Sequence, residues 1–172
     1  MRSSLLPEKI SISLRLFIAQ AVTVIFLIMA LMSFSIPYAS SIRPEFLVML
    51  IYYWAVYRPT LITPVFVFLL GVMMDVLLGL PIGLNAIALL AVQWLVRRQR
   101  LFLMGQSFIG LWLGFMVAVS AAVFFKWFVM SLLELTILPA GPALSSILTS
   151  IFLFPLISLF LLGVHKILPV TD

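Results

Sequence analysis

The chain has 172 residues, of which 65% are hydrophobic and only 9% are charged, and its mean hydropathy is +1.34. Soluble domains are about 45–50% apolar and about 25% charged, so this composition excludes an ordinary soluble enzyme, a disordered chain and a free nucleic-acid-binding domain. Cysteine is absent, which removes a disulfide framework, a thiolate metal site and a cysteine nucleophile. Basic residues give a formal net charge of +5 but lie between long apolar runs, and membrane topology explains them better than a nucleic-acid partner.

Six apolar runs predict an all-α integral membrane protein, a six-transmembrane-helix bundle that forms a single domain over residues 1–172. A bilayer core of about 30 Å needs roughly 20 apolar helical residues. The first helix is expected to be retained, because its apolar run is too long for a signal peptide and no small-residue cleavage site follows it. The expected helices cover residues 15–36, 44–57, 61–79, 82–97, 104–130 and 143–166.

The segment 44–57 is short for a transmembrane helix, because its 14 residues cover only about 21 Å. Such a helix must thin the bilayer locally or be supported by neighbouring helices. A re-entrant hairpin made of the segments 44–57 and 61–79 is the alternative.

The distribution of Lys and Arg predicts that both termini lie in the cytoplasm, because basic residues concentrate on that side of a membrane. With this orientation the opposite side holds only Arg43 and Lys126. A basic cluster at 97–100 (Arg-Arg-Gln-Arg) is explained by topology and anionic lipid head groups, and docking of a cytoplasmic partner is the alternative. The cytoplasmic basic residues are Arg2, Lys9, Arg15, Arg58, Arg97, Arg98, Arg100 and Lys166.

The polar inventory argues against an enzyme. The single histidine, His165, has no second histidine with which to form a catalytic or metal site, and nucleotide-binding, zinc-protease and nucleophile-elbow motifs are missing. Asp75 is the one acidic residue inside an expected span, whereas an intramembrane aspartyl protease needs two. We therefore expect no catalytic residues, cofactor or metal.

Asp75 is nevertheless a candidate functional residue, because burying an acidic side chain in a membrane span costs free energy and such residues are commonly functional. Its expected depth matches that of Lys126, so the two could pair, although Lys126 could instead reach the interface. One interpretation is a partner or ligand contact, and the other is an internal cap that fixes helix packing. Small residues recur around it every four positions, at Gly71, Gly79 and Gly83, which lets another backbone approach closely.

Two later helices carry their own signals. The segment 104–130 has a stripe of small residues at Gly110, Gly114, Ala118 and Ala122, which is expected to pack inside the bundle rather than against another protein. The segment 143–166 contains Pro155, which removes a backbone donor and should kink the helix.

Arg43-Pro44-Glu45 is followed by Tyr53-Trp54 and Pro59, and then by the block Gly71, Asp75, Gly79 and Gly83. With these residues the sequence resembles the MreD family of bacterial rod shape-determining membrane proteins. The specific part of the resemblance lies in residues 43–95, and the looser part extends over essentially the whole chain. Glu45 and Phe154 stand where the family has a shorter acid or amide and a Trp, respectively. The residues that carry the resemblance, or that are candidates for packing or partner contacts, are Arg43, Pro44, Glu45, Tyr53, Trp54, Pro59, Gly71, Asp75, Gly79, Gly83, Asn85, Gly110, Gly114, Lys126 and Pro155.

The resemblance implies a non-enzymatic scaffold in the bacterial inner membrane, part of the elongation or Rod complex that supports peptidoglycan synthesis and rod cell shape. Its implied partner is the single-span protein MreC, which links it to the MreB filaments, to RodA and to a class B penicillin-binding protein. It also implies contacts with membrane lipids, no nucleic acid, and a fold similar to the substrate-binding subunits of energy-coupling factor transporters, with an outward pocket near Asp75.

A transporter subunit that binds a small ligand is the alternative function. It shares the expected fold and the polar residues near the outer face. Ligand-dependent thermal stabilisation would distinguish it from a scaffold. A membrane enzyme is the third class, but it would need clustered polar residues in one span, which the sequence lacks.

Overall fold

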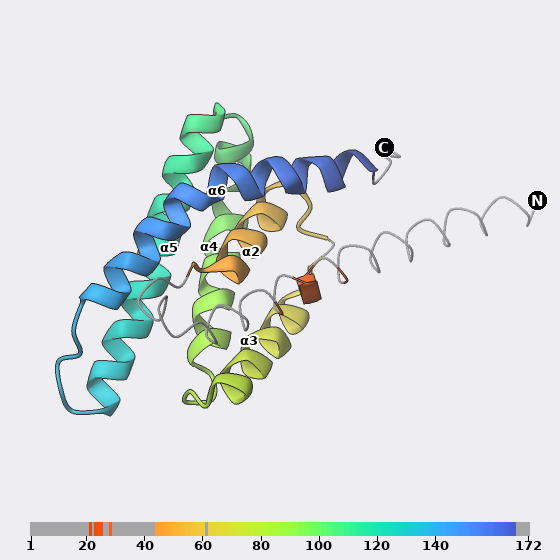
Figure 1. Ribbon diagram of the computed structural model, residues 1–172. Helices are drawn as coiled ribbons and strands as arrows, with labels where there is room; N and C mark the ends of the chain where they lie inside the picture. Colours follow the sequence, from red (N-terminus) through yellow and green to blue (C-terminus); the bar gives the residue numbers. More distant parts are fainter. Residues whose placement is uncertain (1–20, 22, 26–27, 29–43, 61, 168–172) are drawn as a thin grey trace, which may run out of the picture.

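The computed structural model describes residues 21, 23–25, 28, 44–60 and 62–167. Most of the helix expected at 15–36, the residue Arg43 and the side chain of His165 lie outside the described residues. The described part is helical and contains no strand. Its helices are α2 (Phe46–Tyr57), α3 (Pro64–Leu78), α4 (Leu84–Met104), α5 (Phe108–Leu133) and α6 (Gly141–Ile167) (Figure 1).

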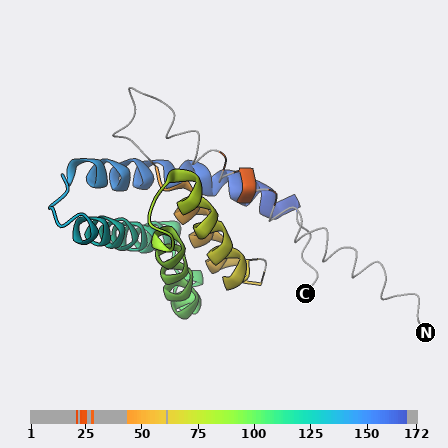
Figure 2. The same ribbon diagram turned by 90° about the horizontal axis from the view of Figure 1, so that it is seen from below.

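The short helix α2 lies at the centre of the bundle, and Figure 2 shows the other helices gathered around it. It packs on α4, α5 and α6, and eleven of its twelve residues are buried. A helix that is apolar on every side is stable where it is buried on every side. Its backbone covers only about 18 Å, which is too short to span a bilayer core by itself. Because nearly all of its residues are buried, neighbouring helices rather than lipid surround it. α3 packs mainly on α4 rather than on α2, which argues against a hairpin made of α2 and α3.

The helix α3 has clear start and stop signals in its sequence. Thr63 is the N-cap residue and its hydroxyl accepts a hydrogen bond from the backbone N–H of Phe66, while Pro64 occupies the first helical position, where its missing N–H costs nothing. The helix ends at Gly79, whose left-handed conformation (φ = 65°) suits glycine.

The helix α4 runs further than expected. The sequence predicted an end near 97, whereas the helix continues through the basic cluster to Met104, and α5 follows after only three residues. The reason is local: residues 97–104 are Arg, Gln, Leu, Phe and Met, most of which favour helix, and no glycine interrupts them before Gly105. The basic cluster is therefore part of a helix rather than of a loop.

The helix α6 changes direction near its middle, as Figure 1 shows, and Pro155 lies inside it. Proline lacks the N–H that would bond to the carbonyl four residues earlier, and its ring crowds that carbonyl, so a bend at this position is expected. The hydroxyl of Ser158 donates a 2.8 Å hydrogen bond to the carbonyl of Pro155.

The outer surface of the bundle is apolar. Two helices, α5 and residues 141–163 of α6, are long and apolar enough to cross a membrane, and α2 and α3 are apolar but shorter. Large hydrophobic side chains point outward from α3, α5 and α6, and water would not favour so much exposed apolar surface. Examples are Val65, Leu69, Val117, Phe152 and Leu156.

Candidate functional site

The carboxylate of Asp75 caps the beginning of helix α4 from the end of helix α3. Its Oδ2 accepts a 2.9 Å hydrogen bond from the backbone N–H of Gly83, and its Oδ1 accepts a 3.0 Å bond from that of Asn85. Asp75 is fully buried. The first N–H groups of a helix lack intrahelical partners and carry partial positive charge, so a carboxylate at this point satisfies them and is itself stabilised.

Glycines make this cap possible. Gly71 lets α3 approach α4 so closely that a Cβ added there would overlap the backbone of Ala86. Gly79 and Gly83 take positive φ angles of 65° and 102°, which reverse the chain between the two helices. The spacing of four residues in the sequence thus has three separate causes: close packing at Gly71, capping at Asp75, and chain reversal at Gly79 and Gly83.

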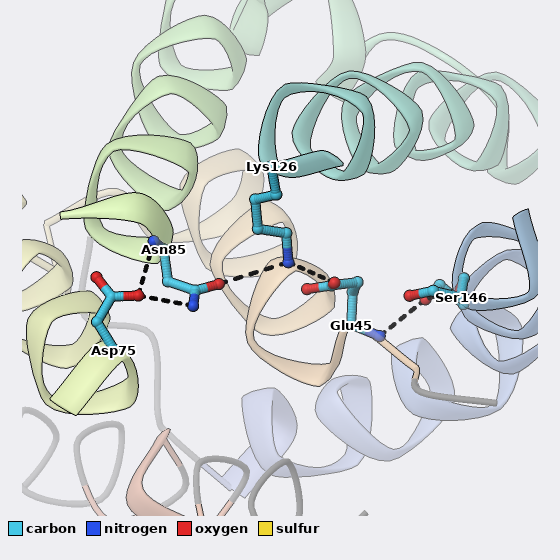
Figure 3. A network of polar contacts seen from close by, with 6 residues as sticks. Glu45, Asp75, Asn85, Lys126 and Ser146 are labelled. Carbon is cyan, nitrogen blue, oxygen red and sulfur yellow. Dashed lines mark hydrogen bonds and ion pairs between the residues drawn. The ribbon is translucent and has the colours of Figure 1, made fainter. Parts of the chain in front are cut away.

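Asn85 connects the cap to helix α5 (Figure 3). Its side-chain N–H donates a 2.8 Å hydrogen bond to Asp75, and its amide oxygen accepts a 3.4 Å bond from the ammonium of Lys126. The chemistry fixes this orientation of the amide, because a carboxylate requires a donor and an ammonium requires an acceptor. Asp75 and Lys126 therefore do not pair directly, and Asn85 lies between them.

Glu45 extends the same network to the remaining helices. Its carboxylate forms an ion pair with Lys126, and its backbone N–H donates a 2.8 Å hydrogen bond to the hydroxyl of Ser150 on α6. Ser150 in turn donates to the carbonyl of Ser146, which lies beside Glu45 in Figure 3. The network thus joins the start of α2 to α3, α4, α5 and α6.

A partly open cavity of about 360 Å³ adjoins the network at this end of the bundle. Glu45, Asn85 and Lys126 contribute its polar lining, while residues such as Met74 and Trp127 contribute apolar walls. The side chains of Lys126 and Glu45 are 16% and 15% exposed, so the ion pair is accessible from the cavity. The cavity lies next to Lys126 and Glu45, with Asp75 behind Asn85.

At the opposite end of the bundle, α4 holds the connection between α2 and α3. Arg97 donates to the carbonyls of Pro59 and Ile62, and Gln93 donates a 2.9 Å bond to the same carbonyl of Ile62. Arg100 donates a 2.8 Å bond to the carbonyl of Val56 in the last turn of α2. Cations near the end of a helix satisfy its unpaired carbonyls and complement its dipole.

An aromatic cluster occupies the interior between α2, α5 and α6. The rings of Phe115 and Phe154 stack with centroids 4.0 Å apart, and Tyr52 meets both edge-on. The hydroxyl of Tyr52 donates a 2.9 Å hydrogen bond to the carbonyl of Leu111. Gly114 leaves room for this hydroxyl, because an added Cβ would lie 2.6 Å from it.

The remaining candidate residues are dispersed. Tyr53 and Trp54 are buried in α2, and their rings meet edge-on at 5.7 Å. Gly110 lies next to the side chain of Gln106 near the α4–α5 turn, away from the polar network. Pro44 lines the cavity.

Gln93 and Ser150 were not among the candidate site residues predicted from the sequence. Asn85, Gln93, Arg97 and Arg100 share one side of α4 at spacings of eight, four and three residues, and this repeated polar face was a usable signal. Ser150 gave no such signal, because hydroxyls are frequent in its helix and many bond to their own preceding turn.

The arrangement of these side chains orients charges and holds helices together. Within the described residues, no group of three or more His, Cys, Asp or Glu side chains gathers in a way that could hold a metal ion. Asp75 accepts hydrogen bonds from three N–H donors, and one carboxylate oxygen of Glu45 is paired with Lys126.

No curated protein and no solved structure matches the chain. A family model does match: that of the rod shape-determining protein MreD, over residues 11–165. The matched range contains Asp75, Glu45, Lys126 and the arginines of α4. Because it spans most of the 172 residues, the chain belongs to the MreD family.

Proposed function

We propose that this chain is a non-enzymatic scaffold of the bacterial Rod complex, a multi-pass protein of the cytoplasmic membrane that binds the single-span protein MreC. The proposal rests on one observation: the connections between the described helices are short. The connections are residues 58–63, 79–83, 105–107 and 134–140. With no sizeable loop in this part of the chain, the faces of apolar helices are the main surfaces available for a partner.

Membership of the MreD family ties the chain to rod shape determination, to the rod-shape complex and to the membrane. Through MreC the scaffold would connect the cytoplasmic MreB filaments to RodA and to a class B penicillin-binding protein, and so support peptidoglycan synthesis. In a membrane, small residues and close packing rather than hydrophobic burial drive helix association, so a single-span helix is a suitable partner.

The proposed orientation places both termini in the cytoplasm. Among the described residues, Arg58, Arg97, Arg98 and Arg100 lie at the end of the bundle where α2 and α4 finish. Asp75 and Glu45 lie at the other end, and Lys126 is paired there with Glu45. This asymmetry supports a cytoplasmic position for the arginine-rich end, because cytoplasmic segments carry the excess of Lys and Arg.

A second candidate function is favoured by the cavity. A volume of about 360 Å³ with a few polar groups in apolar walls falls within the size range of small-molecule sites. The chain would then be the ligand-binding subunit of a transporter, with a fold similar to that of the substrate-binding subunits of energy-coupling factor systems. This function predicts association with ATPase subunits and a coupling protein.

Affinity purification tests the two functions together. The tagged full chain is isolated from native membranes in mild detergent, and the co-purifying proteins are identified by mass spectrometry, with an unrelated tagged multi-pass protein as the control. Recovery of an MreC-type protein in near-stoichiometric amount, with wall-synthesis enzymes, is the expected result. Recovery of ATPase subunits and a coupling protein instead would overturn the scaffold proposal.

A further inference from the structure

We propose that the cavity beside Glu45 and Lys126 binds one membrane phospholipid whose head group is zwitterionic and carries a primary ammonium. The ammonium of the lipid would bond to Glu45 and its phosphate to Lys126, with part of an acyl chain along the apolar walls. This inference does not rest on the scaffold function, because it concerns a ligand of the bundle itself and is tested on the purified chain.

The ion pair of Glu45 and Lys126 has unused hydrogen-bonding capacity. Lys126 has three N–H donors, of which the described residues use two, one on Glu45 and one on Asn85. Glu45 has two carboxylate oxygens, and only one of them accepts a hydrogen bond from the described part of the chain. One donor and one acceptor therefore remain side by side at the cavity, and both side chains are partly exposed.

The charges around the cavity favour a zwitterionic ligand. Glu45 and Lys126 together are neutral, so a ligand with a net charge gains from one of them and is repelled by the other. An anionic head group would also face the carboxylate of Asp75, which lies just beyond Asn85. A zwitterion places an opposite charge on each partner. A primary ammonium supplies the N–H donor that the free oxygen of Glu45 needs, whereas a quaternary ammonium has none.

The shape and position of the cavity suit an amphiphilic ligand. Its walls are apolar, with Met74, Leu78, Val123 and Met130 among the lining residues. It lies where α3 ends, α4 begins and α5 approaches its last turns. In the proposed orientation this end of the bundle would face the outer head-group region of the membrane. Trp127 lines the cavity and donates a 3.1 Å hydrogen bond to the carbonyl of Leu138, an arrangement typical of interfacial tryptophans. The occupant should therefore be an amphiphile.

The test uses the full chain, purified in detergent and depleted of lipid, with melting followed by intrinsic fluorescence. Phosphatidylethanolamine, phosphatidylcholine and phosphatidylglycerol with identical acyl chains are added separately. A ligand that binds the folded state raises the melting temperature by an amount that grows with the ratio of its concentration to its dissociation constant. We expect phosphatidylethanolamine to stabilise most, and native mass spectrometry to detect one retained molecule. Phosphatidylcholine should bind roughly tenfold more weakly, as expected for the loss of a charge-assisted hydrogen bond.

Two variants localise the effect. Ala143→Phe places a ring in the cavity and leaves both charged residues in the chain, and should abolish the lipid-dependent shift and the retained lipid. Leu148→Phe, at a position 56% exposed on the same helix, is the matched control and should behave like the wild type. Glu45→Gln keeps an oxygen for Lys126 but removes the carboxylate, and should erase the preference for phosphatidylethanolamine over phosphatidylcholine. This variant decides the question if Ala143→Phe does not fold.

Three results would overturn the proposal. Equal stabilisation by all three lipids would show a general solvation of the apolar surface. Preferred stabilisation by phosphatidylglycerol would show an anion site. An unchanged phosphatidylethanolamine preference in Ala143→Phe and Glu45→Gln would place the lipid elsewhere. None of these results depends on whether MreC co-purifies, so a failure here is distinct from a failure of the scaffold function.

Discussion

Asp75 and Asn85 make a double contact across the α3–α4 turn, because one carboxylate oxygen of Asp75 accepts hydrogen bonds from both the backbone N–H and the side-chain N–H of Asn85, at 3.0 and 2.8 Å. The first bond caps helix α4. The second turns the amide oxygen of Asn85 toward Lys126. A single buried carboxylate therefore fixes the start of one helix and the orientation of the group that reaches the next.

Asp75→Ala should destabilise the protein by at least about 2 kcal/mol, because three N–H groups in a buried site lose their acceptor. The measurement is thermal melting of the purified variant in detergent. Met73→Ala, at a neighbouring position that is 43% exposed, is the control and should have a small effect. A stable Asp75→Ala variant that fails to bind MreC would instead identify Asp75 as a partner contact.

Gly71→Ala should lower the melting temperature, because the new Cβ would overlap the Cα and backbone nitrogen of Ala86. Over-packing of this kind costs about 1–3 kcal/mol. Adding Ala86→Gly should rescue little of the loss, since the overlap is mainly with backbone atoms. Gly163→Ala is the control, because an added Cβ there meets nothing within 4 Å. Equal melting of Gly71→Ala and wild type would mean that α3 and α4 can separate without cost.

The sequence was sufficient to single out Asp75, because an acid in an apolar run is conspicuous, and to place a bend at Pro155. It could not identify what bonds to Asp75. Similar depth allowed either a direct pair with Lys126 or a Lys126 that reaches the interface, whereas the structure places Asn85 between the two residues. That arrangement depends on how Gly79 and Gly83 reverse the chain, and depth along a helix axis carries no information about such a turn.

For the fold, too, the sequence predicted where the helices lie but not which residues contact one another between them. Apolar run lengths located the five described helices to within a few residues except at the end of α4. The basic cluster was expected to face lipid head groups, and a charge cluster does not reveal that Arg97 and Arg100 bond to carbonyls of another segment. The burial of α2 on every side likewise follows from packing on α4, α5 and α6.

Arg97→Met should destabilise the bundle by about 1.5–3 kcal/mol, because the carbonyls of Pro59 and Ile62 lose a charged donor. Arg98→Met removes the same charge from a side chain that lies over the ring of Trp94, 4.6 Å from its centroid, and should cost less than about 1 kcal/mol. Comparing the melting temperatures of the two variants separates the contribution of the hydrogen bonds of Arg97 from that of the positive charge of the cluster. Equal losses would show that only the positive charge of the cluster matters.

Gly114→Ala should be less harmful when Tyr52 is also replaced. The new Cβ would lie 2.6 Å from the Tyr52 hydroxyl, which Tyr52→Phe removes. Tyr52→Phe alone should cost about 1 kcal/mol through the lost bond to the carbonyl of Leu111. A double-mutant cycle on melting free energies should therefore give a favourable coupling. Strict additivity would contradict the contact between α2 and α5 at this point.

Exchanging the charges of Glu45 and Lys126 tests whether Asn85 belongs to the same network. Lys126→Glu alone should destabilise by about 2–4 kcal/mol, because it sets two carboxylates against each other in a partly buried site. Adding Glu45→Lys restores an ion pair with the two charges exchanged. The carboxylate now on α5 would face the amide oxygen of Asn85, because the hydrogen bond to Asp75 holds that amide in place. The double variant should therefore recover only part of the lost stability. Full recovery would show that Asn85 turns freely and that the cap on α4 does not govern the ion pair.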